Sequence, residues 1–221
     1  MDFSFTEEQT LLADSVRRYL EDRAAGMQGH HFTEFGRNAT AFGSATSGTI
    51  TLGSVAAANN IEFRCATATF AAKPIVLGPT TGWIRIDTLG ATSPTVSFPV
   101  TGTNNLEITA TSSGTAAAPT NGVLVYNTGP VNPTGNLVLK NLGATGTGNS
   151  QVTLNAAVGS NVVNVSVQRN TGIGSGSFIR ISNPANAWTG TTTVAAGALL
   201  QLGASEVLPH GTAAGNLVVD G

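Results

Sequence analysis

The 221-residue sequence contains little charge, and this scarcity excludes several kinds of protein. Asp, Glu, Lys and Arg together make up 10% of the residues, whereas about a quarter is usual in soluble domains. The net charge is only −2 and the basic residues are scattered, so we expect no basic surface for nucleic acid. No apolar run approaches the roughly 18 residues that a membrane-spanning helix needs. The sequence therefore predicts neither a nucleic-acid partner nor a membrane-spanning segment.

Cysteine, histidine and aromatic residues are also rare. Cys65 is the single cysteine, which excludes an internal disulfide and a cysteine-based zinc cluster, and we expect its thiol to be free and buried. The histidines are His30, His31 and His210, none of them in a recognisable catalytic motif. The adjacent pair His30 and His31 is interpreted as part of an exposed linker. We predict no catalytic residue, no metal site and no cofactor.

Glycine and β-branched residues are abundant instead. The chain holds 27 glycines, and these separate short segments in which apolar and polar residues alternate or β-branched residues cluster. Alternation with a period of two is typical of half-buried strands. The glycine-rich segment 172–176 leads into such a strand and therefore predicts a turn, not a phosphate-binding loop. The expected strands are residues 49–52, 61–65, 84–87, 95–98, 106–109, 123–126, 137–140, 152–154, 162–167 and 178–181.

Many short strands with no helix between them are compatible with two architectures. An antiparallel sandwich favours tight hairpins, and Asn121-Gly122 is the one such signal in the chain. A solenoid favours glycine- and asparagine-rich corners around a narrow core. The low aromatic content of 6% suits the narrow core, so we favour the solenoid. Asn136, Asn141, Asn161 and Asn164 could then form a ladder between coils, although ordinary turn chemistry is the favoured interpretation.

Residues 186–203 contain the clearest repeat-like unit. Two strand-like runs, residues 191–194 and 199–202, are joined by a small-residue turn. The unit has no helix and cannot bury its apolar face alone, so it must stack on neighbours. Its signature residues are Asn186, Trp188, Thr189, Gly190, Thr192, Val194, Gly197, Leu199, Leu202 and Gly203.

This signature resembles the passenger-associated β-strand repeat of bacterial autotransporters. Trp188 stands where the family usually has tyrosine, which keeps a flat aromatic ring at the corner of the coil. The resemblance implies a right-handed parallel β-helix at the cell surface, over residues 48–221. It further implies a structural or adhesive function, with an unknown surface ligand or host matrix component as partner.

The first residues have a different character. Nine of the 22 charged residues lie in residues 1–23. The capping box that begins at Thr6 and the apolar stripe of Leu12, Val16 and Leu20 predict a short amphipathic helix over residues 7–24. This segment resembles the first helix of acyl-CoA dehydrogenases, flavin oxidoreductases whose flavin and catalytic residues lie elsewhere. We expect residues 1–25 to be a helix of foreign type and residues 26–47 a linker.

Three alternatives for function follow from these patterns. The favoured one is a non-catalytic passenger fragment, secreted or on the cell surface, that could self-associate through an open end of the solenoid; the N-terminus shows no signal peptide. The second is a remnant or mispredicted fusion of an acyl-CoA dehydrogenase. The third is a glycan-acting β-helix, in which Glu62, Asp87 and Glu107 would stack along one face as catalytic carboxylates. For these three acids, a place on the solvated side of their own strands is the favoured interpretation.

Overall fold

A computed structural model describes residues 31–32, 49–53, 60–65, 73–88, 93–114, 117–143, 148–210 and 215–220. The expected helix of residues 7–24 lies outside the described residues, and so does most of the expected linker. The described residues belong to one compact unit that begins at His31. Every named element within them is a β-strand, which confirms the all-β prediction for this part of the chain.

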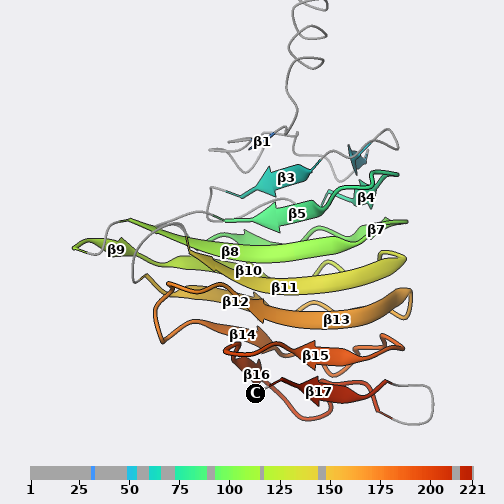
Figure 1. The fold of residues 1–221 in the computed structure, drawn as a ribbon. Helices are drawn as coiled ribbons and strands as arrows, with labels where there is room; N and C mark the ends of the chain where they lie inside the picture. The colour runs from blue at the N-terminus through green and yellow to red at the C-terminus, as the bar shows by residue number, and fades with distance from the viewer. Residues whose placement is uncertain are drawn as a thin grey trace, which may run out of the picture. The chain divides into compact units, whose positions relative to one another are not determined.

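The strands form three sheets, here named sheets 1, 2 and 3 (Figure 1). Sheet 1 contains, in spatial order, β1 (His31–Phe32), β3 (Ile61–Arg64), β5 (Ile84–Asp87), β8 (Leu106–Gly114), β11 (Gly135–Gly143), β13 (Val162–Arg169), β15 (Thr192–Val194) and β17 (Leu217–Val219). Sheet 2 contains β6 (Thr95–Val96), β10 (Gly122–Tyr126), β12 (Ser150–Leu154), β14 (Phe178–Ile181) and β16 (Leu200–Leu202). Sheet 3 contains β2 (Ile50–Leu52), β4 (Ile75–Leu77) and β7 (Val100–Gly102). The short β9 (Pro119–Thr120) pairs with the end of β8.

The chain visits the sheets in turn and therefore winds as a parallel β-solenoid. From β5 it continues to β6, β7 and β8, so that β8 returns to sheet 1 beside β5. Every strand pair between coils is parallel, and β8 with β9 is the antiparallel pair among the described residues. This arrangement confirms the solenoid over the antiparallel sandwich. The right-handed winding that the family resemblance implies stays a prediction.

Coil length varies along the solenoid. Residues that bond between adjacent coils are 22 residues apart for the side chains of Arg85 and Glu107, but 31 residues apart for the Asn105 side chain and the backbone N–H of Asn136. The extra residues enter at the corners, because the paired strands on either side remain in register. A fixed sequence period is therefore absent although the coils stack regularly.

The core is a narrow column of aliphatic side chains inside the three sheets. Successive coils place equivalent residues above one another, and burial of each side chain contributes roughly 1.5–3 kcal/mol. Phe63 and Phe98 add an edge-to-face contact with ring centroids 5.5 Å apart. Along sheet 1 the two inner rows are Ile84, Leu106, Leu137, Val165 and Thr192, and Ile86, Ile108, Leu139, Val167 and Val194.

Sheet 3 was predicted only in part, since the expected strand of residues 49–52 is β2, whereas β4 and β7 were not expected. Its strands have three residues each, too few to display alternation, and a proline precedes β4 and β7. Proline is tolerated at the start of a strand because its missing N–H removes no bond within the ladder. Its carbonyl still accepts a bond from the preceding coil. Three such bonds of 2.8–2.9 Å run from Ile50 N to Pro74 O, from Ile75 N to Pro99 O and from Val100 N to Pro130 O.

Candidate functional site

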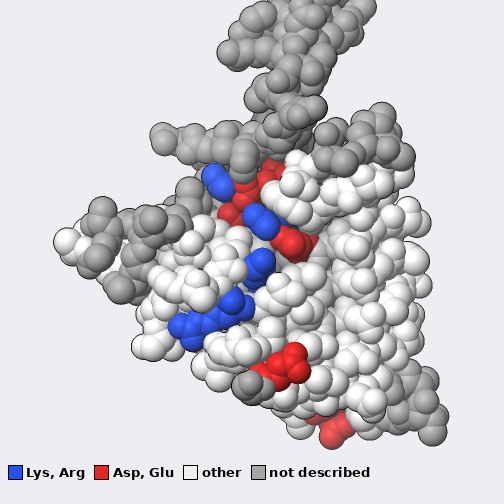
Figure 2. All heavy atoms as spheres, in the orientation of Figure 1, with Lys and Arg blue, Asp and Glu red and all other residues white. Residues whose placement is uncertain are grey.

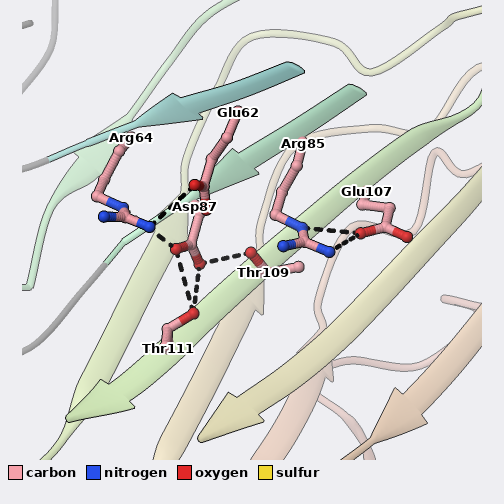
Figure 3. A network of polar contacts seen from close by, with 7 residues as sticks. All are labelled: Glu62, Arg64, Arg85, Asp87, Glu107, Thr109 and Thr111. Atoms are coloured by element: carbon pink, nitrogen blue, oxygen red, sulfur yellow. Dashed lines mark hydrogen bonds and ion pairs between the residues drawn. The ribbon is translucent and has the colours of Figure 1, made fainter. Parts of the chain in front are cut away.

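A cluster of polar side chains lies on the outer side of sheet 1, across β3, β5 and β8 (Figure 3). Alternation turns Ile84 and Ile86 into the core, so Arg85 between them and Asp87 after them lie on the outer face of the sheet. The register then forms two neighbouring rows. One row contains Glu62, Arg85 and Glu107, and the other contains Arg64, Asp87 and Thr109.

Arg85 and Glu107 form the first half of the cluster. Arg85 Nε and Nη2 both donate to Glu107 Oε2, at 2.8 and 2.6 Å. The guanidinium also lies over the Trp83 ring, with its carbon 4.0 Å from the ring centroid. Charge-assisted bonds of this kind are stronger than neutral ones, and the stacked ring limits the freedom of the arginine. The pair therefore links β5 firmly to β8.

Asp87 forms the centre of the second half. Its side chain is buried, and Thr109 Oγ1 donates to Oδ1 at 2.5 Å. Thr111 Oγ1 lies 2.9 Å from Oδ1 and 3.1 Å from Oδ2. Burial raises the pKa of Asp87 to about 7, and the nearby Glu62 carboxylate adds to the rise, while the threonine bonds and Arg64 oppose it. Near neutral pH this carboxyl group is therefore divided between its protonated and ionised forms.

Arg64 connects the two acids of β3 and β5. Its Nη2 donates to Glu62 Oε2 at 2.9 Å, and its Nε lies 3.6 Å from Asp87 Oδ2. The second distance is too long for a hydrogen bond, and Arg64 Nε has no hydrogen-bond partner in the described structure. One guanidinium thus lies against two buried carboxyl groups.

The structure corrects and extends the sequence interpretation of the three acids. Glu62, Asp87 and Glu107 do lie on one face of adjacent coils, as the stacking hypothesis required. Their assignment to solvated positions is wrong for Glu62 and Asp87, which are 3% and 0% exposed. Arg64 and Arg85, which neutralise them, were not singled out. A signal was present, because opposite charges recur 22–23 residues apart, but the irregular coil length obscured it.

The cluster is built to join coils. Each acid is engaged by an arginine or threonine from its own or a neighbouring strand, and the side chains of Glu62 and Asp87 are only 4% and 1% exposed. A glycosidase requires carboxyl groups that a sugar can reach. Among the described residues, no group of three or more His, Cys, Asp or Glu side chains could hold a metal ion. Cys65, beside the cluster, is buried and free as predicted.

The repeat-like signature occupies one coil near the C-terminal end. Residues Thr192 and Val194 lie in β15, the turn follows at Gly197 with φ of 73°, and Leu202 ends β16. Gly172, in the glycine-rich segment 172–176, likewise has a positive φ of 81° and lies in the predicted turn between β13 and β14. Leu199 and Leu202 are half exposed, at 45% and 53%.

Two signature residues make buried hydrogen bonds, one to the neighbouring coils and one within its own coil. Asn186 accepts a bond from Val158 N at 2.9 Å and donates to Val207 O at 2.8 Å, so it spans the coils on both sides. Trp188 is buried, and its indole N–H donates to Thr192 Oγ1 at 3.0 Å. An open depression of about 270 Å³ adjoins them, and its ionisable groups, Glu206 and His210, form an exposed pair 3.1 Å apart.

Close approach of coils explains two signature glycines. A Cβ atom on Gly190 would lie 2.3 Å from both Asn164 Oδ1 and Val163 O. A Cβ atom on Gly203 would lie 2.2 Å from Ser182 Oγ. Neither position leaves room for a side chain, so these glycines are required by the stacking of coils.

Asparagines form ladders between coils at the corners. Asn105 Oδ1 accepts from Asn136 N at 2.8 Å, Asn164 Nδ2 donates to Asn136 Oδ1 at 3.0 Å, and Asn164 Oδ1 accepts from Thr191 N at 2.9 Å. Asn161 N donates to Asn132 Oδ1 at 2.9 Å. The interpretation of Asn136 and Asn164 as ordinary turn residues is therefore wrong.

Asn141, the fourth candidate, is buried at the corner between sheets 1 and 2. Its side-chain amide donates to Ser150 O at 2.9 Å and to Phe178 O at 3.2 Å. It therefore also connects strands of different coils.

Comparisons of the chain with protein-family models, curated proteins and solved structures found no match. The class that the fold defines is an all-β parallel solenoid. No helix long and apolar enough to cross a bilayer occurs in the described part of the chain.

Proposed function

We propose that residues 48–221 form a non-catalytic, passenger-type segment of a secreted or surface-exposed bacterial protein, with a structural or adhesive role. The observation that carries this proposal is that the signature of residues 186–203 corresponds to one coil, with β15 in sheet 1 and β16 in sheet 2. A sequence unit that coincides with a stacking unit is the property that a passenger repeat requires.

The contacts between coils support a role in extension. Each coil bonds to the next through continuous parallel ladders, through asparagines at the corners and through buried aliphatic rows. Such a solenoid gains stability from nearest-neighbour coils and projects a rigid surface away from its base.

The distribution of charge on the surface favours a partner that binds through shape complementarity and polar contacts, and not through long-range electrostatic attraction. Figure 2 shows charged side chains gathered toward the centre and left of the face in view, blue beside red, while its right side is uncharged. An adhesive partner on such a surface would be a matrix protein or a neutral glycan. We further propose that copies of the chain self-associate through β17, which exposes Leu217, Val218 and Val219.

Surface display tests the proposal. The full chain would be placed between a bacterial export signal and an autotransporter barrel, with an epitope tag at its N-terminal end. We expect intact cells to bind antibody to the tag, and we expect a protease-resistant product the size of the solenoid. Gly190→Val is the control, because its side chain cannot fit between coils and should abolish protease resistance. Failure of the wild-type chain to appear at the surface would contradict the proposal.

A glycan-acting function has one observation in its favour, the pair of carboxyl groups Glu62 and Asp87 with one pKa raised to about 7. A general acid in a glycosidase has a raised pKa of this kind. Polysaccharide cleavage by the wild-type chain that is lost in Glu62→Gln and Asp87→Asn would establish this function in place of the structural one.

A further inference from the structure

We propose that Asp87 is a proton-dependent lock that holds β3 against β5 and β8 most tightly under acidic conditions. The lock consists of Glu62 and Arg64 from β3, Asp87 from β5, and Thr109 and Thr111 from β8 (Figure 3). It therefore spans three consecutive strands of sheet 1. It is a property of this solenoid beyond its role as a scaffold.

The charge balance of the lock depends on one proton. Arg64 contacts both Glu62, at 2.9 Å, and Asp87, at 3.6 Å, while both carboxyl groups are buried. With both acids ionised, the three groups carry a net negative charge in a region of low polarity, and this is costly. With Asp87 protonated, the same three groups are neutral and Arg64 pairs with Glu62.

The other ionisable groups around Asp87 are paired with another residue, lie two strands away or are uncharged. Arg85 on β5 is engaged by Glu107 on β8, in the neighbouring row. Lys140 on β11 is in register with Thr109 and is thus two strands from Asp87. The Cys65 thiol follows β3 within the core, and burial raises its pKa, so it is uncharged. Arg64 is therefore the cation that directly meets Asp87 in the described structure.

Linkage gives the direction of the effect. The pKa of Asp87 rises from 3.8 to about 7 when it is enclosed in the folded coils. Protonation therefore favours the closed lock. Its contribution to stability is complete below pH 3.8, the pKa of Asp87 in the opened coil, and is lost as the pH rises to about 7, the pKa in the closed lock. The fraction of opened lock should grow about tenfold per pH unit within this window and become constant above it.

Cys65 supplies a local measurement of opening. It is the single cysteine of the chain and is 0% exposed. Its backbone N–H donates to Asp87 O at 2.7 Å, so separation of β3 from β5 breaks this bond and uncovers the thiol. Reaction of Cys65 with a thiol reagent therefore reports the opening of this coil.

The experiment measures how strongly the full-length chain protects Cys65 from dithiodipyridine as a function of pH. Protection is the reaction rate in urea-unfolded chain divided by that in native chain at the same pH, which cancels the titration of the thiol itself. We expect wild-type protection to fall about 50-fold from pH 5 to pH 7, to fall about twofold more above pH 7, and then to become constant. In Asp87→Asn, whose amide is always neutral, protection should not change with pH.

Two further variants make the outcomes decisive. Thr111→Val removes a hydroxyl that stabilises ionised Asp87, so the plateau should begin at higher pH, and this variant serves if Asp87→Asn does not fold. Glu107→Gln removes the charge of the neighbouring acid, so it should lower protection at every pH but keep the wild-type dependence on pH. A pH-independent wild type, parallel profiles for wild type and Asp87→Asn, or loss of the pH dependence in Glu107→Gln would each overturn the proposal.

Discussion

Tyr126 donates a hydrogen bond from its buried hydroxyl group to the backbone carbonyl of Phe98, on the preceding coil. Both side chains lie in the core, so the bond connects two coils where water cannot replace it. Burial raises the pKa of Tyr126, which keeps the hydroxyl protonated as a donor. Hydrogen bonds between coils of this solenoid therefore also occur inside its apolar core.

Tyr126→Phe should therefore lower stability without changing the fold. The Phe98 carbonyl would lose this donor, at a cost of about 1–3 kcal/mol in the free energy of unfolding. Urea denaturation followed by circular dichroism measures the change. Val163→Ala, at a side chain 46% exposed, is the control and should stay within ~0.5 kcal/mol of wild type. An equal loss in both variants would contradict the assigned role of the hydroxyl.

Gly190 and Gly197 should respond differently to asparagine. Gly197 has φ of 73°, and no atom of a neighbouring segment lies within 4 Å of the position that a Cβ would occupy. Because Asn tolerates this backbone conformation, Gly197→Asn should cost less than ~1 kcal/mol. Gly190→Asn would force a side chain against Val163 O and should cost ~2 kcal/mol or more. Thermal unfolding of the two variants tests this order, and a reversed order would show that backbone conformation outweighs coil approach.

The Arg85–Glu107 pair should show measurable coupling. Its side chains are 16% and 18% exposed, so solvent screening is reduced relative to a surface pair. A double-mutant cycle with Arg85→Met and Glu107→Gln should give a coupling energy of about 1 kcal/mol, decreasing at high salt. Additive losses in the two single variants would contradict this prediction.

Asn121-Gly122 should resist deamidation in the folded chain. The reaction requires Gly122 N to attack the Asn121 side chain, but Gly122 N donates to Asn149 O at 2.9 Å, and Asn121 Oδ1 accepts from Asn149 N at 2.8 Å. Mass spectrometry of native and urea-unfolded samples should show a rate at least ~10-fold lower in the native chain, because reaction requires local opening. Equal rates would indicate that this corner opens freely.

Local pattern allowed most strands to be predicted, because alternation in segments such as β5 and β10 directly reflects one face in the core and one outside. Two strands of sheet 3, β4 and β7, were missed for a physical reason. Ile75–Leu77 is too short to show a period, and Pro74 before it suggests a turn when the solenoid corner is unknown.

The candidate site could be predicted only in part. Glu62, Asp87 and Glu107 were grouped from their spacing, yet their burial depends on Arg64, Arg85, Thr109 and Thr111 in adjacent rows. Row positions follow from the register, and coils of 22–31 residues give no fixed register in sequence. The Asn136 and Asn164 ladder was underestimated for the same reason, since a turn asparagine and a ladder asparagine look alike in one coil.

Because the coils differ in residue number but stack at one spacing, the length of the solenoid depends on its number of coils and not on its number of residues. Each coil advances the stack by one inter-strand spacing, about 4.8 Å, whether it contains 22 residues or 31. Insertions at a corner therefore enlarge the cross-section of the solenoid at that coil and leave its length along the axis unchanged. Evolution can thus change the corner loops, through insertions, and the length of the solenoid, through the number of coils, independently.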